Sequence, residues 1–474
     1  MEKQAYRPID DLKKLLKSKK YGETLTGLAS RLGLHLSGYQ HIFKNKTKRF
    51  FSKAQTYAQG LLLSEIRNIE KLSETMNSNY YQMQHFITES AWSGRELIDQ
   101  VAQEVNSLLP KGKLTGLIID ESGWVKKGHK SVGVGHQYCG NVGKLSNSQV
   151  AVFAALNNGD FSSMVDARLF LPEDWCLNST RCDEAGIPES ERGFKTKLDL
   201  AYEIVKHQSN QIDFDFVSAD GYYGNDADFA RKIDELGYLY MLDIHANQSI
   251  YTEPTELEIP ERKSTKGPTP RKLKATKPAI SVTDYMNQLS EEQWQKLTVR
   301  NTTKGKLTGH YHLAKVFIWN KAIDRIEQRL LVIRKTITSD KELEIKFSFT
   351  NANLEQYTPE VIAYMQAQRF FVEHCIKESK QILGIDQFQT RKWNAWMHQT
   401  ALNFMVSSFI LKEKLRNNED LPLLSARDIK ELIIFQLHKQ MTDDQMYEKI
   451  INRHIRRQQD INNAYLRQNP NLSK

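Results

Sequence analysis

The first point in the chain where residue types could do chemistry is an acid that closes a short apolar run. The run Gly116-Leu-Ile-Ile-Asp120 is rich in branched side chains, and Ser122-Gly123 follows it. This pattern predicts a buried strand that ends in a loop. Burying a carboxylate there costs several kcal/mol unless a cation pairs with it. Asp120 is therefore a candidate metal ligand, although an Asp at a strand exit also commonly caps the next turn.

A second acid follows the same rule about 100 residues later. The apolar run Phe214-Asp-Phe-Val-Ser-Ala ends in Asp220 and then Gly221. In a mixed sheet with helices on its faces, acids at the ends of two buried strands can meet at one edge. The sequence thus predicts that Asp120 and Asp220 are neighbours.

A third acid lies on a predicted helix that begins after the cap residue Thr358 and stops at Gly384. At about 100° per residue, one stripe of this helix carries a single carboxylate among polar and cationic residues, namely Gln366, Arg369, Glu373, Lys377 and Lys380. Nearby cations would keep Glu373 ionised, as a metal ligand must be, and would attract phosphates. The alternative is a solvent-facing row of ion pairs.

Composition limits the classes of protein that fit these residues. With 474 residues, 40% of them hydrophobic and 26% charged, the chain is globular and large enough for two or three packed units. A net charge of +9 favours a polyanionic partner, although a generic basic protein also fits. We find neither a bilayer-spanning apolar run nor a signal-peptide layout, and expect a cytoplasmic protein. The four cysteines form no Cys-x-x-Cys pair, which argues against a zinc site and a disulfide framework.

The first 110 residues read as helical. Ala29 and Gly33 are four residues apart between two apolar-periodic segments, which fits a helix-turn-helix with a recognition helix starting near Ser37. An ordinary helical hairpin fits the same residues. The segment 44–53 mixes cations with aromatic residues, as nucleic-acid-facing segments do, but a solvated basic face is also consistent with it.

Strand patterns begin at Leu114. Four strands joined by Gly and Asn turns are expected to be antiparallel, and a helix at 195–206, the strand before Asp220, a helix at 226–236 and a strand at 238–244 follow. This order predicts a mixed sheet with helices on its faces. A Pro-rich basic stretch at 250–280 suits a phosphate backbone or is a plain linker. Further strands at 296–349 form either an extension of the sheet or a small inserted β unit.

The three acids, in this order, resemble those of DDE transposases, whose catalytic core is RNase H-like. Arg369, Glu373 and Lys380 match the R-E-K part of the signature of cut-and-paste transposases from bacterial insertion sequences related to the IS-four-like superfamily. The stretches around Asp120 and Asp220 are similar to the first and second acid motifs of those families. The resemblance covers about residues 114 to 400. One position departs from it, because Gln366 stands where the signature has a tyrosine that contacts the DNA end.

The resemblance implies an α/β fold: an RNase H-like mixed sheet with helices on both faces, a β-rich insertion between the second and third acids, and a helical N-terminal domain. The expected divisions are a helical DNA-binding domain at 1–110, the first part of the catalytic core at 111–249, the insertion with its basic loop at 250–355, the second part of the core at 356–400, and a helical C-terminal region at 401–474.

The resemblance also implies an activity. The chain is expected to bind the terminal inverted repeats of an insertion element and to cleave and transfer DNA strands in cut-and-paste transposition. By resemblance Asp120, Asp220 and Glu373 are catalytic ligands of two Mg²⁺ ions, for which Mn²⁺ substitutes. The implied partners are double-stranded DNA at the transposon ends and target, and a second copy of the chain in the synaptic complex, close to the nucleoid. The residues expected to contact DNA are Arg369, Lys380, Lys377, Lys126, Lys127 and Trp319.

Some residues allow other interpretations. Trp319 could stack on an unpaired base, but a core aromatic residue on a strand is the more common case. Side chains alternate along a strand, so Glu121 should point away from Asp120. Asp226 suits a helix cap.

Three rival functions remain open at this point. One is a catalytically inactive, transposase-derived DNA-binding protein, and another is an RNase H-like nuclease without strand transfer. The third is a sugar hydrolase that uses a carboxylate pair, which predicts no affinity for DNA and leaves the Arg-Glu-Lys stripe without a role.

Overall fold

The structure is a computed structural model that describes residues 27–261, 270–302, 305–337, 342–418 and 424–437. Residues 438–474 of the predicted helical C-terminal region and the centre of the predicted basic loop lie outside the described residues. Within those ranges no helix combines the length and apolar character needed to cross a bilayer.

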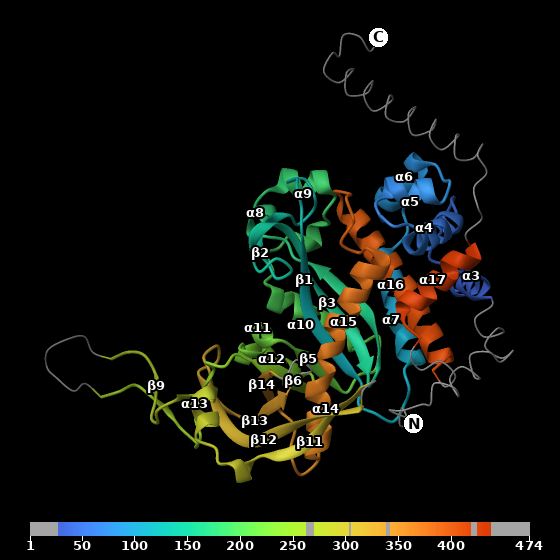
Figure 1. Cartoon of the computed structure of the whole chain (residues 1–474). Helices are drawn as coiled ribbons and strands as arrows, with labels where there is room; N and C mark the ends of the chain where they lie inside the picture. The colour runs from blue at the N-terminus through green and yellow to red at the C-terminus, as the bar shows by residue number, and fades with distance from the viewer. Residues whose placement is uncertain (1–26, 262–269, 303–304, 338–341, 419–423, 438–474) are drawn as a thin grey trace, which may run out of the picture.

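One mixed sheet of ten strands runs through the described part of the molecule (Figure 1). The strand order is β11-β12-β13-β14-β6-β5-β1-β3-β2, and β4 also pairs with β3. The strands are β1 (Gly116–Val125), β2 (Gly135–Cys139), β3 (Lys144–Asn158), β4 (Phe161–Leu169), β5 (Phe216–Ala219), β6 (Leu239–Ile244), β11 (Gln295–Thr302), β12 (Gly305–Asn320), β13 (Arg325–Ile337) and β14 (Leu343–Thr350).

The direction of the strands changes across this sheet. β1 to β4 form antiparallel pairs, as the turn residues between them predict, whereas β5 runs parallel to both β1 and β6. On the other side of β6, β14 pairs antiparallel with it and continues into β13, β12 and β11. The strands between 295 and 350 therefore extend the central sheet, which decides between the two alternatives left open by the sequence.

Helices cover both faces of the sheet, so the predicted mixed α/β class is confirmed. α10 (Lys197–Gln208) packs on β3 and β4 and against α12 (Ala227–Glu235), which packs on β6. α14 (Pro359–Gln368) and α15 (Phe370–Leu383) pack on β1 and its neighbours, and α16 (Trp393–Arg416) joins α15 and α7 (Gly94–Leu108) over β4. Consecutive residues of β1 contact these two groups of helices, which places the groups on opposite faces.

The N-terminal helices gather around α16 and α17 (Ala426–Leu437) in Figure 1. They are α3 (Leu28–Ser37), α4 (Phe51–Leu63), α5 (Ile69–Thr75) and α6 (Tyr80–Thr88). The expectation of a recognition helix starting near Ser37 is wrong, because α3 ends there and only turns and a short bridge precede α4. Residue 400, taken above as a boundary, falls within α16, whose apolar side chains share one core with the sheet.

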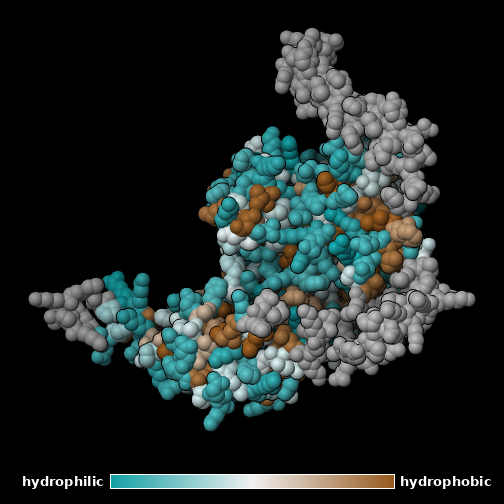
Figure 2. Space-filling view, viewed as in Figure 1, coloured by the Kyte–Doolittle hydropathy of each residue, from teal (hydrophilic) through white to brown (hydrophobic). Residues whose placement is uncertain are grey.

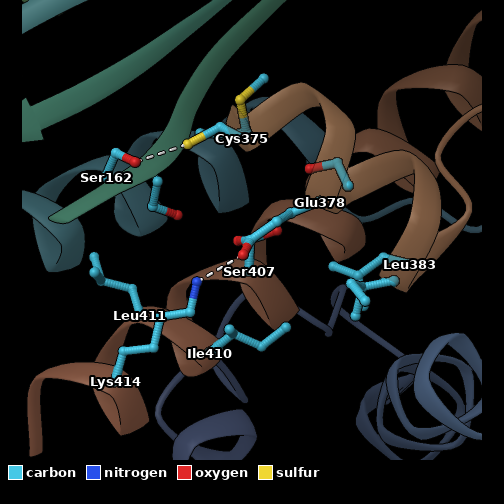
Figure 3. Close-up of a pocket in the computed structure, with 12 residues that line it drawn as sticks. Ser162, Cys375, Glu378, Leu383, Ser407, Ile410, Leu411 and Lys414 are labelled. Atoms are coloured by element: carbon cyan, nitrogen blue, oxygen red, sulfur yellow. Dashed lines mark hydrogen bonds and ion pairs between the residues drawn. The ribbon is translucent and has the colours of Figure 1, made fainter. Parts of the chain in front are cut away.

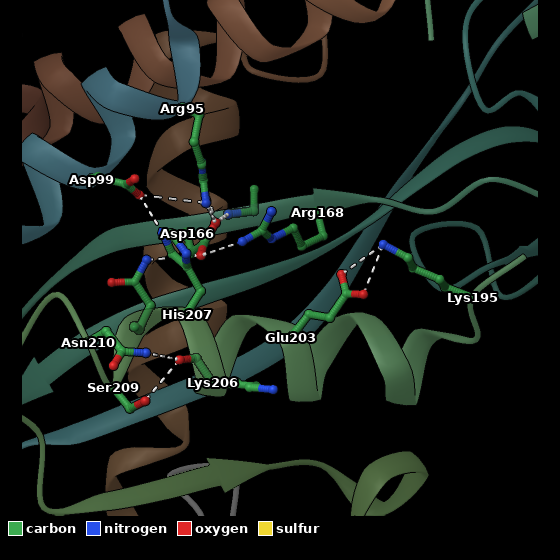
Figure 4. A network of polar contacts seen from close by, with 12 residues as sticks. Arg95, Asp99, Asp166, Arg168, Lys195, Glu203, Lys206, His207, Ser209 and Asn210 are labelled. Atoms are coloured by element: carbon green, nitrogen blue, oxygen red, sulfur yellow. Dashed lines mark hydrogen bonds and ion pairs between the residues drawn. The ribbon is translucent and has the colours of Figure 1, made fainter. Parts of the chain in front are cut away.

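A buried ion-pair network fastens α7 and α10 to the edge strand β4 (Figure 4). Asp166 of β4 is fully buried and accepts hydrogen bonds from Arg95 of α7 at 2.7 and 2.8 Å and from Gln208 of α10 at 2.9 Å. Arg168 lies 3.6 Å from the same carboxylate. Burial alone would raise the pKa of Asp166, but Arg95, Arg168 and Gln208 hold that pKa below its usual range. The network is therefore a structural joint between the helical layer and the sheet.

The face seen in Figure 2 is largely hydrophilic, and its hydrophobic patches are separate. One patch lies over β2 and α8 (Glu173–Cys176), where Leu177, Tyr138 and Val142 are exposed. Apolar surface on this face does not single out a binding site, so charge is the better guide.

Candidate active site

Asp120 and Asp220 lie at the same level of two adjacent parallel strands. Ile118 of β1 pairs with Ser218 of β5, and each acid follows its strand residue by two positions. The sequence predicted that the first strand ends at Asp120, but this is wrong, because β1 continues to Val125 along β3. Only its pairing with β5 ends before Asp120. Asp220 caps α11 (Gly221–Gly224), accepting a hydrogen bond from Tyr222 N at 3.0 Å.

The helix predicted between Thr358 and Gly384 is broken into α14 and α15, with Arg369 at the junction. The expected polar stripe is corrected at Gln366, which lies on the buried side of α14. Glu373 lies in the first turn of α15, and about half of its side chain (52%) is exposed. The acid thus stands on a helix end that faces solvent, next to the turn that carries Arg369.

Arg369 brings three carboxylates together. Its Nη1 lies 3.6 Å from Asp120 Oδ2, its Nη2 donates a hydrogen bond to Glu373 Oε1, and its Nε lies 2.9 Å from Asp243 Oδ2. The side chains of Arg369, Asp120 and Asp243 are each about 15% exposed, so these ion pairs are screened only partly by water. The guanidinium is the cation that compensates the acids.

The acids repel one another. Burial raises the pKa of Asp120 most, Arg369 opposes this rise, and the charges of Asp220 and, less strongly, Glu373 add to it, with the result that the pKa of Asp120 is raised to about 7. Burial lowers the pKa of Arg369, but Asp243, Glu373 and Asp120 raise it overall. The negative charges of Asp220 and Glu373 therefore act on Asp120, and a cation bound near these carboxylates would be stabilised by them.

The donors suit a hard divalent cation. Carboxylate oxygens are the preferred protein ligands of Mg²⁺ and Mn²⁺, and such an ion would offset the repulsion that raises the pKa of Asp120. Among the residues that the structure describes, no three acid, His or Cys side chains already form a ligand set. Two of the acids are paired with Arg369 instead. The carboxylates thus suit a divalent cation in their chemistry and their electrostatic interaction, and in this structure Arg369 supplies the positive charge next to Asp120 and Glu373.

The predicted cations differ in position. Burial lowers the pKa of Lys380, while the charges of Asp386, Cys139 and Asp120 oppose this, so Lys380 is near enough to Asp120 for their charges to interact. Lys126 donates to the carbonyl of Phe388 and burial lowers its pKa to about 8, so its ammonium is already engaged. Lys377 and Lys127 are exposed.

Trp319 lies away from the acids. Asp243 pairs with Ser348 of β14, Ser348 with Val332 of β13, and Val332 with Leu313 of β12. Trp319 is six residues farther along β12, toward the end opposite the site, or about 20 Å at the rise of a strand. Its half-buried ring has Lys321 above it.

Sequence reasoning missed Asp243 and Ser348. Ser348 Oγ donates to Asp243 Oδ1 at 2.7 Å across the β6–β14 pair. Asp243 carried only part of the signal of the two other strand acids, since it lies near the end of the apolar run of β6, the strand next to β5, but Ile244 follows it and no glycine turn does. Ser348 gave no comparable signal. The two interpretations of nearby acids are confirmed: Glu121 pairs with Lys197 of α10 on the opposite face at 2.8 Å, and Asp226 caps α12.

The far side of α15 is fixed to its neighbours (Figure 3). Cys375 Sγ donates to Ser162 Oγ of β4 at 3.1 Å, and Glu378 pairs with Lys414 of α16 at 2.7 Å. Burial raises the pKa of the Cys375 thiol to about 12, which keeps it protonated. These contacts hold the helix so that its first turn presents Glu373.

Comparison with known proteins gives three findings. The family described as "DDE superfamily endonuclease" matches residues 39–306, more than half of the chain, a segment that contains Asp120 and Asp220 and stops before α14. The "Probable transposase for insertion sequence element IS701" of Microchaete diplosiphon is 32% identical over 180 residues. That match covers 38% of this chain and 44% of the relative, so the chain aligns with less than half of that protein. A solved structure titled "Cryo-EM structure of piggyBac transposase synaptic complex with hairpin DNA (SNHP)" is 10% identical, with a TM-score of 0.36 over 94% of this chain and 85% of the other.

Proposed function

Because the chain belongs to the DDE superfamily endonucleases, we propose that it is an insertion-sequence transposase that binds its element's terminal inverted repeats, cuts them and joins them to target DNA. The observation that supports this most directly is the group of carboxylates around Arg369. The carboxylates Asp120 and Glu373 share this one guanidinium, and Asp220 adds its charge to the same group. Placing carboxylates this close together costs electrostatic free energy unless a cation is bound, and a purely structural role would not require such a cluster.

The sheet order supports an RNase H-like core as the frame of the site. Read from one edge, β4-β3-β1-β5-β6 combines an antiparallel meander with two strands parallel to β1. Asp120 and Asp220 come from adjacent members of the parallel set, and Glu373 comes from a helix that packs on β1. In such a core the three acids converge although they are far apart in sequence.

Each residue has a proposed role. Asp120, Asp220 and Glu373 hold two Mg²⁺ ions, which when bound activate the attacking water or 3′-hydroxyl and stabilise the leaving oxygen. Arg369 and Lys380 bind phosphates of the DNA end, and Lys377 and Lys127 extend this basic surface. Lys126 orders the segment after β1 through its contact with Phe388 rather than by reaching DNA.

The proposed partners are the duplex ends of the element, the target duplex, and a second copy of the chain that brings two ends together. The net charge of +9 suits such a polyanion. The sugar-hydrolase alternative gives no use for this charge or for the cations around Glu373.

The test is nicking of a labelled duplex that carries the element's terminal repeats, in Mg²⁺ or Mn²⁺, by wild type and by Glu373→Gln. We expect both proteins to bind and only wild type to nick. Glu378→Gln is the matched control, because Glu378 is on the same helix but pairs with Lys414 on its far side. Equal nicking by wild type and Glu373→Gln would refute the assignment of Glu373. Binding without nicking by wild type would favour the inactive DNA-binding protein, and nicking without end joining would favour a nuclease.

A further inference from the structure

Arg369 contacts its three acids through different nitrogen atoms. Its two terminal nitrogens pair with Asp120 and Glu373, whereas Nε, the guanidinium nitrogen nearest the main chain, lies 2.9 Å from Asp243 Oδ2 as an ion pair without a hydrogen bond. If the proposed function holds, Asp120 and Glu373 are the acids that bind metal, so the cation and Arg369 compete for them. Asp243 is outside that set and keeps its contact with Nε.

Asp243 is itself fixed from behind. Its Oδ1 accepts a hydrogen bond from Ser348 Oγ at 2.7 Å, and Ser348 Oγ accepts one from Gln366 Nε2 at 2.9 Å. Ser348 is fully buried and Gln366 is 3% exposed, so water competes weakly for these bonds. The remaining oxygen, Oδ2, is thereby directed at Arg369.

We propose that Asp243 is a positioning residue for the reaction: Gln366 and Ser348 orient it, and it tethers Arg369 by Nε so that the two terminal nitrogens turn to a DNA phosphate when Asp120 and Glu373 bind metal. This inference rests on the proposed function. It also gives Gln366 a task in place of the tyrosine of the family signature. Gln366 acts through the buried Ser348 and Asp243, not by touching DNA.

The tether fits the chemistry of a guanidinium. Arginine presents its donors as a rigid planar fork, so an ion pair that holds the Nε edge of the fork against Asp243 restricts the directions in which Nη1 and Nη2 can point. A phosphate is then met by a preoriented pair of donors. Without the tether, the side chain must lose its rotamer freedom at the moment of binding.

The test uses the full chain in two assays. Single-turnover nicking is measured on the terminal-repeat duplex, and binding in Mg²⁺ is measured on a copy of that duplex that already carries the nick. We expect Asp243→Asn and Ser348→Ala to slow nicking about 10- to 100-fold, the usual effect of removing a residue that orients a site. Ser348→Thr keeps the hydroxyl and should restore the rate to within about threefold. The slope of log K against log salt should become shallower by about 0.9 in the two slow variants, as for one lost phosphate contact.

A double-mutant cycle separates this role from others. In an Arg369→Ala background, Asp243→Asn should cost nothing further, because both residues act through one contact. A further tenfold loss there, or a higher Mg²⁺ requirement in Asp243→Asn alone, would overturn the tether and make Asp243 a metal ligand. A wild-type nicking rate in Ser348→Ala would also overturn it. So would a nicking rate that falls in every variant in proportion to the drop in the thermal unfolding midpoint. If wild type does not nick, the proposed function fails, and the salt slopes still decide the tether.

Discussion

Replacing Asp120 by Asn should stabilise the metal-free protein at alkaline pH. Burial first, and then the charges of Asp220 and Glu373, raise the pKa of Asp120 from its ordinary 3.8 to about 7, against the opposing effect of Arg369. The folded protein therefore holds a proton on Asp120 that the unfolded chain releases near pH 4. Stability falls as pH rises through this interval, and the penalty is complete above pH 7. At 1.36 kcal/mol for each pH unit, it amounts to roughly 4 kcal/mol.

The assay is urea unfolding of wild type and Asp120→Asn in EDTA at several pH values. Near pH 4 the two free energies of unfolding should be similar, and at pH 8 the variant should be more stable by up to about 4 kcal/mol. Added Mg²⁺ should stabilise wild type more than the variant at pH 8, because a bound cation offsets the same repulsion. A variant that is no more stable than wild type at pH 8, with a gap that does not change with pH, would show that Arg369 compensates Asp120 completely.

Three further predictions concern the frame of the site and the helical layer. A Cβ on Gly224 would lie 1.9 Å from the carbonyl oxygen of Asp243, so Gly224→Ala should destabilise the fold by about 3 kcal/mol or more in urea unfolding, whereas Gly193→Ala, whose Cβ meets open space, should not. Asp166→Asn takes the buried carboxylate from the partly exposed Arg95 and should cost about 3 kcal/mol, against less than about 1 kcal/mol for Glu203→Gln in the more exposed pair with Lys195. Burial would raise the pKa of Glu104, but His35, Tyr39 and Lys412 lower it to about 2. The roughly 3 kcal/mol this contributes should be present above pH 5 and lost as pH falls toward 2, and Glu104→Gln, compared with wild type by acid titration of stability, should lack that dependence.

Two of the strand acids could be located from the sequence because the end of a strand has a simple signature. An apolar run, an acid and a glycine located Asp120 and Asp220, and the parallel pairing of β1 with β5 puts both at one level. Asp243 shows only part of this signature, because Ile244 follows it within β6 and no glycine does, and no family motif drew attention to it. Local patterns identify such residues, but only the order of the strands says that β6 is next to β5.

The helix between Thr358 and Gly384 shows what periodicity alone does not give. A regular 100° repeat places Gln366, Arg369 and Glu373 on one stripe. Within that stripe, however, Gln366 is buried, whereas Glu373 is about half exposed at the edge of the site. The buried Gln366 donates a hydrogen bond to Ser348, which lies 18 residues earlier on strand β14. A contact of this kind depends on tertiary packing and leaves no mark in the local pattern.

The β-rich insertion is consequently part of the site rather than an appended module. β14 pairs with β6, and this pairing is what sets Ser348 beside Asp243. The same sheet carries Arg300 of β11 over the ring of Phe370, the residue that follows Arg369, with the guanidinium carbon 4.0 Å from the ring centre. Both contacts meet at the junction of α14 and α15. The strands that separate the second acid from the third in sequence therefore form the wall against which Arg369 and the third acid are placed.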